Sequence, residues 1–162
     1  MNIPQRDLFT NAAKDYELMA RALAYLGDHW HDHPDYKQAA KHAGLSPHHF
    51  HKVFTRWAGV SPKNYIGALT HNAARDMLVG GASVEEASFE AGLSSPSRLH
   101  DLCIKHEALS PGEARSKAKG VDMVWGAAPC PFGIAVGLIS PRGLSAYGFC
   151  ELGEVEASFE DF

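Results

Sequence analysis

Residues 43–62 read AGLSPHHFHKVFTRWAGVSP, and residues 91–111 read AGLSSPSRLHDLCIKHEALSP. The Ala-Gly-Leu-Ser that begins at Ala43 returns at Ala91, 48 positions later. Each stretch predicts the end of a short helix, a tight turn at glycine and a second helix with a clean start. This is the outline of a helix-turn-helix unit, and internal repetition of this kind decides the fold. We therefore expect two such units in the chain.

Serine-proline pairs mark the starts of four predicted helices. A serine at the cap accepts a backbone hydrogen bond, and a proline at the first helical position has a preset φ and no N–H to satisfy. The four pairs begin at Ser46, Ser61, Ser95 and Ser110. Capping boxes are predicted for Ser83 with Glu86 and for Ser110 with Glu113.

Apolar spacing predicts the remaining helices. Residues 16–30 carry apolar side chains at helical intervals, with Asp15 as the predicted cap, and Asp35 precedes a short helix over residues 36–43. A long central helix is expected from Pro62 to about Leu78. Its buried stripe is predicted at Ile66, Leu69, Ala73, Met77 and Leu78. Seven helices are expected up to about Lys117.

The composition changes beyond the last helix. Residues 118–122 are predicted to be a linker, and β-type runs follow at residues 121–126, 134–139 and 144–149. Ser140–Gly143 predicts the turn between the last two runs, and residues 154–162 predict a helix just beginning, with Phe159 and Phe162 exposed. A hairpin with one helical turn cannot bury its apolar side, so this tail predicts an incomplete domain. The expected fold class is mainly α: a bundle of seven helices with two helix-turn-helix units, followed by a partial β-rich (α+β) fragment.

The charge is unevenly distributed along the chain. Residues 1–118 hold 13 Lys+Arg and 13 Asp+Glu, whereas residues 119–162 hold 2 and 6, which accounts for the net charge of −4. The helical part is therefore neutral, with all ten histidines, rather than acidic. No apolar run approaches the roughly 18 residues of a membrane span, and three cysteines without metal-type spacing favour a reducing compartment. We expect a cytoplasmic protein that does not contact membranes.

The second helix of each repeat has an apolar back and a polar front. The predicted buried positions are Phe50, Val53, Phe54 and Trp57 in the first copy, and Leu99, Leu102 and Cys103 in the second. The polar fronts carry His48, His51, Lys52 and Arg56, and then Ser97, Arg98, His100 and Asp101. A solvated face of an ordinary bundle has the same pattern, but its doubling favours two helices that enter the DNA major groove.

The motif AGLSPHHFHKVFTRWAGVSPKNYI, followed by a second copy that ends in LSPGEAR, resembles the AraC-type DNA-binding domain over residues 15–117. The resemblance implies a sequence-specific transcriptional regulator whose two recognition helices enter successive major grooves. It implies double-stranded DNA as partner, with RNA polymerase as a candidate second partner. It assigns base reading to His48, His51, Lys52, Ser97, Arg98, His100 and Asp101. Many relatives carry a basic residue where Asp101 stands, so we expect the second unit to bind less tightly.

Two further groups complete the predicted interface. Arg56 follows Lys52 by one helical turn on the polar front and is expected to reach bases or phosphates. Ser46 and Ser95, as predicted N-caps, bring the N-termini of the recognition helices near the DNA.

The stretch PFGIAVGLISPRGLSAYGF, residues 131–149, is similar to the N-terminal β-rich subdomain of methylated-DNA–protein-cysteine methyltransferases. The Ada group of regulators carries this enzyme fused to an AraC-type domain. The resemblance implies an N-terminal extension (1–14), a DNA-binding domain (15–117), a linker (118–122) and an incomplete methyltransferase subdomain (123–162). The enzyme's acceptor cysteine lies in a Pro-Cys-His-Arg motif, which this sequence lacks. We therefore expect no enzyme activity from this chain alone and a methyltransferase in the full-length parent.

Two alternatives remain beside this interpretation. One is an alkyltransferase active by itself through Cys130, although Pro129-Cys130-Pro131 lacks the His-Arg that would activate the thiol. The other is an interaction domain that does not bind DNA. No cofactor and no metal site are expected, because the histidines at residues 29–33 lie at a helix end and point apart.

Overall fold

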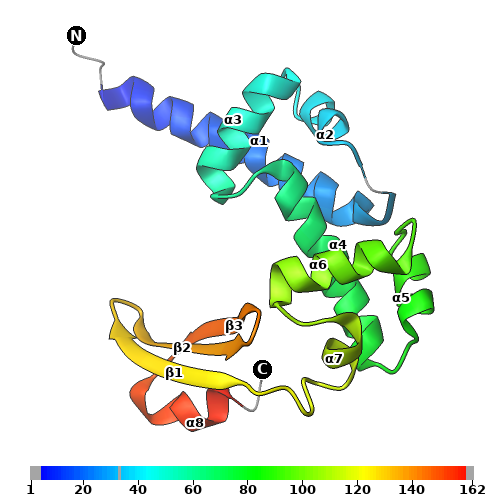
Figure 1. Cartoon of the computed structure of the whole chain (residues 1–162). Helices are drawn as coiled ribbons and strands as arrows, with labels where there is room; N and C mark the ends of the chain where they lie inside the picture. The colour runs from blue at the N-terminus through cyan, green and yellow to red at the C-terminus, as the bar shows by residue number, and fades with distance from the viewer. Residues whose placement is uncertain (1–4, 33, 160–162) are drawn as a thin grey trace. The chain divides into compact units, whose positions relative to one another are not determined.

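The computed structural model describes residues 5–32 and 34–159, and it is mainly helical with one small sheet (Figure 1). The chain divides into two compact units, residues 1–70 and 71–162. The boundary falls inside the long helix α4 (Pro62–Val79). Among the described residues seven α-helices precede residue 117, as the sequence predicts, and each unit contains one of the two repeated stretches.

The first unit packs its helices around an aromatic core. They are α1 (Gln5–His29), α2 (Tyr36–His42), α3 (Pro47–Ala58) and the start of α4, with a 3-10 turn η1 (Trp30–Asp32) after α1. Phe50 and Phe54 of α3 are fully buried, with ring centroids 5.5 Å apart. Leu26 of α1 is fully buried in the same cluster. The apolar back of α3 thus fixes which side of that helix faces outward.

The start of α1 differs from the prediction. The helix begins at Gln5 and runs across the predicted boundary at residues 14 and 15. Asp15 therefore does not cap a helix; it lies inside α1, and its carboxylate pairs with Arg56. The prediction was wrong because residues 5–14 include no proline or glycine that would end a helix, and an aspartate is tolerated inside one when a cation neutralises it.

The helices of the second unit surround a core of small residues. They are the second half of α4, α5 (Val84–Glu90), α6 (Pro96–Glu107) and α7 (Pro111–Arg115). Their buried cluster comprises Ala74, Leu78, Ala87, Ala91, Leu99, Cys103 and Ala114. Both predicted capping boxes are confirmed, because Glu86 N donates to Ser83 Oγ at 3.1 Å and Glu113 N donates to Ser110 Oγ at 3.3 Å, with the reciprocal bonds also present.

The buried side of α4 lies one position away from most of the predicted stripe. Thr70, Ala74 and Leu78 are buried. The other predicted positions are only half-buried: Ile66, Leu69, Ala73 and Met77. The polar Thr70 can be buried because its hydroxyl donates to the carbonyl of Ile66 at 3.1 Å, a local bond that apolar periodicity does not detect.

The second unit also contains a three-stranded antiparallel sheet of order β1-β2-β3. Its strands are β1 (Val124–Cys130), β2 (Gly133–Ser140) and β3 (Gly143–Cys150). The predicted turn at Ser140–Gly143 joins β2 to β3, and a bulge interrupts their register between Leu138 and Ile139. The first predicted run, residues 121–126, was wrong in its bounds because β1 starts at Val124, which pairs with Ile139 of β2.

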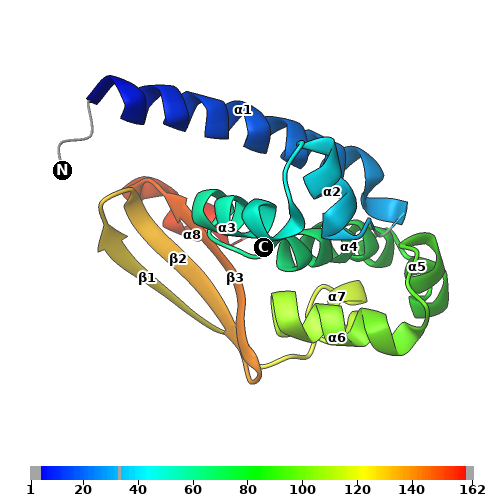
Figure 2. The same cartoon turned by 90° about the horizontal axis from the view of Figure 1, so that it is seen from above.

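A short helical segment follows the sheet. It consists of the 3-10 turn η2 (Leu152–Glu154) and α8 (Val155–Ser158), and Figures 1 and 2 both show α8 beside the strands. Phe162, which we predicted to be exposed, lies outside the described residues.

Polar contacts fasten the β2–β3 turn to the end of α6. Ala108, which ends α6, has a left-handed φ of 52°. Its carbonyl accepts hydrogen bonds from Ser140 Oγ at 2.7 Å and from Arg142 Nε at 3.3 Å. Arg142 also pairs with Glu113 of α7. Ser140 is buried in this contact, so the sheet and the second helix-turn-helix are joined within one unit.

Candidate nucleic-acid interface

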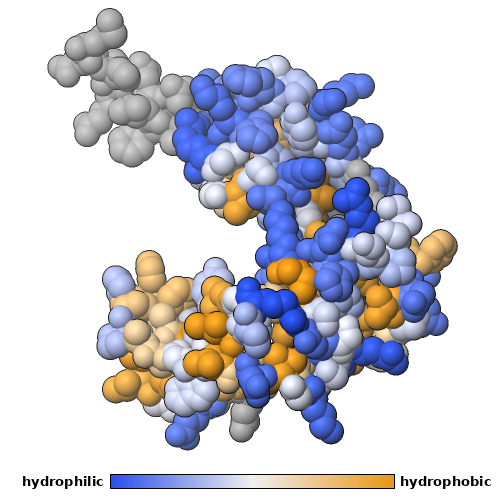
Figure 3. All heavy atoms as spheres, in the orientation of Figure 1, coloured by the Kyte–Doolittle hydropathy of each residue, from blue (hydrophilic) through white to orange (hydrophobic). Residues whose placement is uncertain are grey.

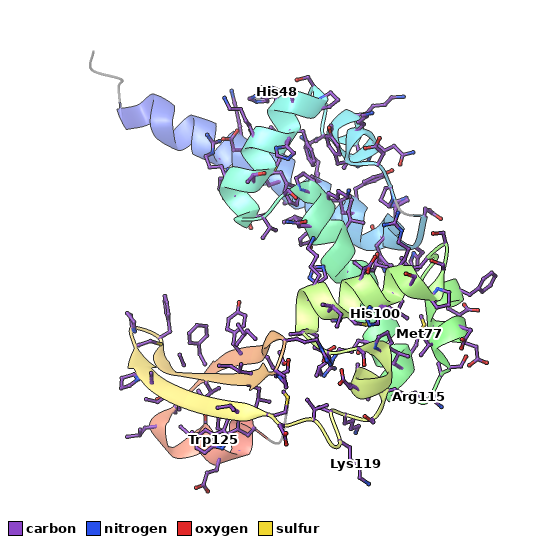
Figure 4. All side chains as sticks on the ribbon, viewed as in Figure 1. His48, Met77, His100, Arg115, Lys119 and Trp125 are labelled. Atoms are coloured by element: carbon purple, nitrogen blue, oxygen red, sulfur yellow. The ribbon has the colours of Figure 1, made fainter. Side chains whose placement is uncertain are left out.

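The second helix of the first repeat, α3, presents the predicted polar front. Ser46 caps α3 by accepting a bond from His49 N at 3.3 Å, as predicted, and Phe50, Val53 and Phe54 form the buried back. All four predicted contact residues are exposed: His48, His51, Lys52 and Arg56. Figure 4 shows His48 near the start of α3, where the helix N-terminus adds partial positive charge.

Trp57 is the exception to the predicted back of α3. Its side chain is 44% exposed, and its ring lies 6.0 Å from that of Tyr16 on α1. The prediction that Trp57 belongs to the core was wrong because α1 covers only the earlier turns of α3 completely. Trp57 instead lines a small apolar pocket of about 170 Å³ between α1 and α3.

The two cations of the first repeat differ in their surroundings. The guanidinium of Arg56 pairs with the carboxylate of Asp15. Lys52 has no ion-pair partner within residues 5–32 and 34–159. Lys52 therefore presents an uncompensated charge, whereas Arg56 must leave a carboxylate before it can bind another anion.

The second helix of the second repeat, α6, presents a less cationic front. Ser97, Arg98, His100 and Asp101 are exposed, and Leu99 and Cys103 are buried on the back. Figure 4 labels His100 on this helix. Asp101 offsets Arg98, so the local net charge is near zero unless His100 is protonated.

Ser95 occupies the predicted N-cap position of α6 but makes no side-chain cap bond. Arg98 N instead donates to the backbone carbonyl of Ser95 at 3.0 Å. The prediction of a serine cap was wrong in this respect, because this backbone turn bond uses the N–H that the hydroxyl would have accepted from.

A buried polar cluster behind α6 was not predicted from the sequence. Arg75 Nε donates to Glu107 Oε1 at 2.7 Å, and His71 Nε2 lies 3.3 Å from Glu107 Oε2. The His71 ring stacks on His106 with centroids 5.4 Å apart. Arg75 and Glu107 are 32 positions apart, so no local pattern signals their contact. The cluster ties the end of α6 to α4 inside the second unit.

Two pKa values in this cluster are shifted. Burial raises the pKa of Glu107, but its contacts with His71 and Arg75 outweigh burial and hold the pKa below the ordinary 4.5. Burial lowers the pKa of His106 below the ordinary 6.5, and the neighbouring His71 and Lys105 lower it further. Glu107 is therefore an anion and His106 neutral near pH 7.

The three cysteines are free thiols in the described part of the chain. Burial raises the pKa of Cys103 to about 11, which keeps that thiol protonated. Cys130 ends β1, and its sulfur accepts a hydrogen bond from Phe132 N at 3.4 Å. No three His, Cys, Asp or Glu side chains among the described residues are arranged to hold a metal ion, and His33 lies outside those residues.

No helix within residues 5–32 and 34–159 has both the length and the apolar composition needed to span a bilayer.

Comparison with known proteins identifies the repeated region. Residues 39–117 match a family model described as a helix-turn-helix domain. Over 99 residues the chain is 28% identical to the HTH-type transcriptional activator RhaS of Escherichia coli, a match that covers 60% of this chain and 36% of RhaS. Over 75 residues it is 25% identical to the uncharacterized HTH-type transcriptional regulator YbfI of Bacillus subtilis, covering 46% of this chain and 27% of YbfI. The chain thus matches only about a quarter to a third of the length of these relatives.

Solved structures share the fold. An AraC-type transcriptional regulator from Chromobacterium violaceum superposes with a TM-score of 0.59 at 20% identity, covering 67% of this chain and 97% of that one. The DNA-binding domain of AdpA, solved in complex with a target DNA, superposes with a TM-score of 0.57 at 24% identity, covering 62% of this chain and 91% of that one. Both neighbours match the helical region in extent.

Proposed function

We propose that the chain binds double-stranded DNA sequence-specifically as part of a transcriptional regulator, because residues 39–117 match a helix-turn-helix family model and the chain shares the fold of an AraC-type regulator. The observation that carries the proposal is the paired design of α3 and α6. Each follows a short helix and a tight turn, each packs an apolar back into its own unit, and each exposes a front of hydrogen-bonding side chains. Such a front matches the donor and acceptor pattern of the major groove.

The first repeat supplies most of the binding free energy in this proposal. His48, His51 and Lys52 lie on the first two turns of α3, within reach of base edges, and Arg56 reaches a phosphate or base once Asp15 releases it. Ser46 keeps the first turn of α3 formed, with its N–H groups directed at the DNA backbone.

The second repeat contributes a weaker contact. Arg98 is its main reader, with Ser97 and His100 as hydrogen-bonding neighbours and Ser95 at the start of the helix. Asp101 repels phosphates, although its carboxylate can accept a hydrogen bond from a cytosine amine. We expect α3 and α6 to enter successive major grooves, about 34 Å apart. RNA polymerase is the candidate second partner of the regulator.

A titration of duplex DNA against salt tests the proposal. We expect Lys52→Ala to weaken binding to a selected site by about 1–3 kcal/mol if Lys52 reads a base, or to reduce the salt slope by about 1 if it contacts a phosphate. Lys119→Ala is the matched control, since Lys119 is an exposed lysine between α7 and β1, outside both repeats. Equal affinity of both variants and the wild type would remove the first repeat from the interface, and a flat salt dependence would favour an interaction domain.

We further propose that the parent protein belongs to the Ada group, with residues 123–162 as the front of a methyltransferase domain. The support is the order of parts: a helix-turn-helix region, a short connection, and an antiparallel meander with turns at Phe132 and at Ser140–Gly143. A Pro-Cys-His-Arg motif encoded downstream of Phe162 would support this assignment. Transfer of a labelled alkyl group from DNA to this chain, lost in Cys130→Ala, would instead establish the alternative of an enzyme active by itself.

A further inference from the structure

One face of the three-stranded sheet carries large apolar side chains that nothing covers within the described residues. Directly paired residues of antiparallel strands point to the same side, so Val124, Ile139 and Leu144 share a face with Tyr147 and Phe149. Phe132 joins them through ring contact with Phe149 at 5.7 Å. These six side chains are 48% to 77% exposed. Figure 3 shows apolar surface gathered over the strands.

The opposite face of the sheet is the one that α8 covers through contacts with β2 and β3, although Trp125 on β1 is still 61% exposed there. Trp125 packs on Phe159, just after α8, with ring centroids 4.7 Å apart, and Figure 4 shows it on the α8 side of β1. Val136, in the middle of β2, is buried on this covered face, and Ser140 is buried against Ala108. An antiparallel sheet that packs one face against the core normally has polar residues on its solvent-exposed face, and this sheet does not.

The exposed face has a ridge and a trough. Tyr147 and Phe149 form the ridge along β3, with perpendicular rings 6.3 Å apart. The trough lies beside them on β1 and β2 and is lined by Gly126, Ala128, Ala135 and Gly137. No Asp, Glu, Lys or Arg lies on this face of the strands. An uncharged face has no electrostatic complementarity to nucleic acid or to a charged peptide, but it is compatible with another uncharged apolar surface such as its own copy.

We propose that this face binds a second copy of the chain, with the aromatic ridge of each copy seated in the glycine-alanine trough of the other. A two-fold axis makes such a contact self-complementary, because ridge and trough lie side by side on one patch. Large aromatic side chains bring about 150–250 Å² each, so the face offers roughly 700 Å² of apolar surface per copy, close to the about 800 Å² per partner of a standard interface. The proposal is independent of DNA binding and competes with the Ada-group assignment, in which later residues of a methyltransferase domain would cover this face.

Sedimentation equilibrium of the whole chain tests the proposal through two substitutions that act differently. A Cβ added at Gly126 meets nothing within 4 Å, so Gly126→Val fits the folded chain but fills the trough. Tyr147→Lys instead replaces one of the two aromatic rings of the ridge with a charged side chain. We expect a wild-type dimer at micromolar concentration and a dissociation constant raised at least about tenfold in each variant. Phe89→Lys, at a side chain that is 78% exposed on α5, is the control and should leave dimerisation unchanged.

The Gly126→Val substitution distinguishes specific docking from nonspecific hydrophobic association. Valine adds apolar surface, so nonspecific association would strengthen in Gly126→Val, whereas docking into the trough weakens. Melting temperatures of the variants close to the wild-type value exclude misfolding as the cause. A wild-type chain that stays monomeric at high concentration, or a Gly126→Val dimer as tight as wild type, would overturn the proposal. Duplex binding by monomeric Tyr147→Lys would show that the proposed function is unaffected.

Discussion

Ser46 and Ser95 occupy the same place in the two repeats, but only Ser46 caps its helix with its side chain. Losing a serine N-cap typically costs about 1 kcal/mol. We therefore expect Ser46→Ala to lower the free energy of unfolding by about that amount, measured by urea denaturation, whereas Ser95→Ala has a clearly smaller effect. An equal loss in both variants would mean that the Ser95 hydroxyl also caps its helix in solution.

His106 makes the stability of the second unit depend on pH. Its pKa is below 6.5 in the folded chain, so the unfolded chain binds the proton more tightly. The stability from neutral His106 is complete above pH 6.5 and is lost as the pH falls through the lower, folded value. We expect the urea midpoint to decrease as the pH is lowered from about one unit above 6.5 to about one unit below it. The decrease should be less steep in His106→Gln.

Glu107 acts in a separate, more acidic window. Its pKa is held below 4.5, so the stability from its ionised form is present above 4.5 and is lost as the pH falls through the folded value. Because the two windows are separate, Glu107 does not contribute to the pH dependence near neutral pH. If the urea midpoint of His106→Gln depended on pH there as steeply as that of the wild type, another histidine would be responsible.

Single residues were predicted well where the signal is local. The caps at Ser46, Ser83 and Ser110 follow from serine, proline and glutamate within four positions of one another. The cluster of His71, Arg75 and Glu107 was missed, because its members meet only when α4 and α6 pack together.

At the scale of elements, the two recognition helices end alike but with different residues. Gly59 ends α3 with a φ of 71°, and Ala108 ends α6 with a φ of 52°. A left-handed conformation costs a residue with a Cβ roughly 1 kcal/mol more than glycine. We expect Gly59→Ala to destabilise the chain by about that amount and Ala108→Gly to stabilise it, both measured by thermal unfolding.

Steric contact does not complicate the first of these substitutions. A Cβ at Gly59 meets nothing within 4 Å, so its cost is conformational. The Cβ of Ala108 lies near Gly143, so its loss removes a small contact and reduces the gain. A Gly59→Ala variant as stable as wild type would contradict the argument.

Helix starts were predicted more accurately than the bounds of the other elements. Proline and serine fix the first residues of α3, α4, α6 and α7 in the sequence itself. No serine-proline pair marks the start of α1, and the bounds of β1 depend on its pairing with β2, which lies later in the chain. Pairing and packing are tertiary choices, and local patterns do not encode them.

At the scale of the whole molecule, Ser140 joins the sheet to the second helix-turn-helix. Its buried hydroxyl donates to Ala108 O and accepts from Arg142 N at 3.1 Å. We expect Ser140→Ala to cost about 1 kcal/mol, because the Ala108 carbonyl loses one of its two donors and Arg142 N loses its acceptor. Hydrogen exchange should report faster opening of both α6 and β2. Ser145→Ala is the matched control, since that hydroxyl is buried without a partner in the described residues.

Opening confined to β2 in Ser140→Ala would mean that sheet and helix unfold separately. The repeat predicted the helical region of the molecule, and alternation predicted the sheet, but neither pattern indicates where the sheet is attached. That attachment rests on a serine hydroxyl and an arginine 32 and 34 positions beyond the carbonyl they bind.

The contact between Asp15 and Arg56 bears on how a DNA reader discriminates between sites. A phosphate can recruit this guanidinium only by displacing an anion already in place, so the exchange yields little net attraction at an arbitrary sequence. Where the whole helix fits its groove, the remaining contacts drive the exchange. Under the proposed function, we expect the N-terminal helix to lower affinity for random duplexes more than for the correct one, so that selectivity increases at the expense of affinity.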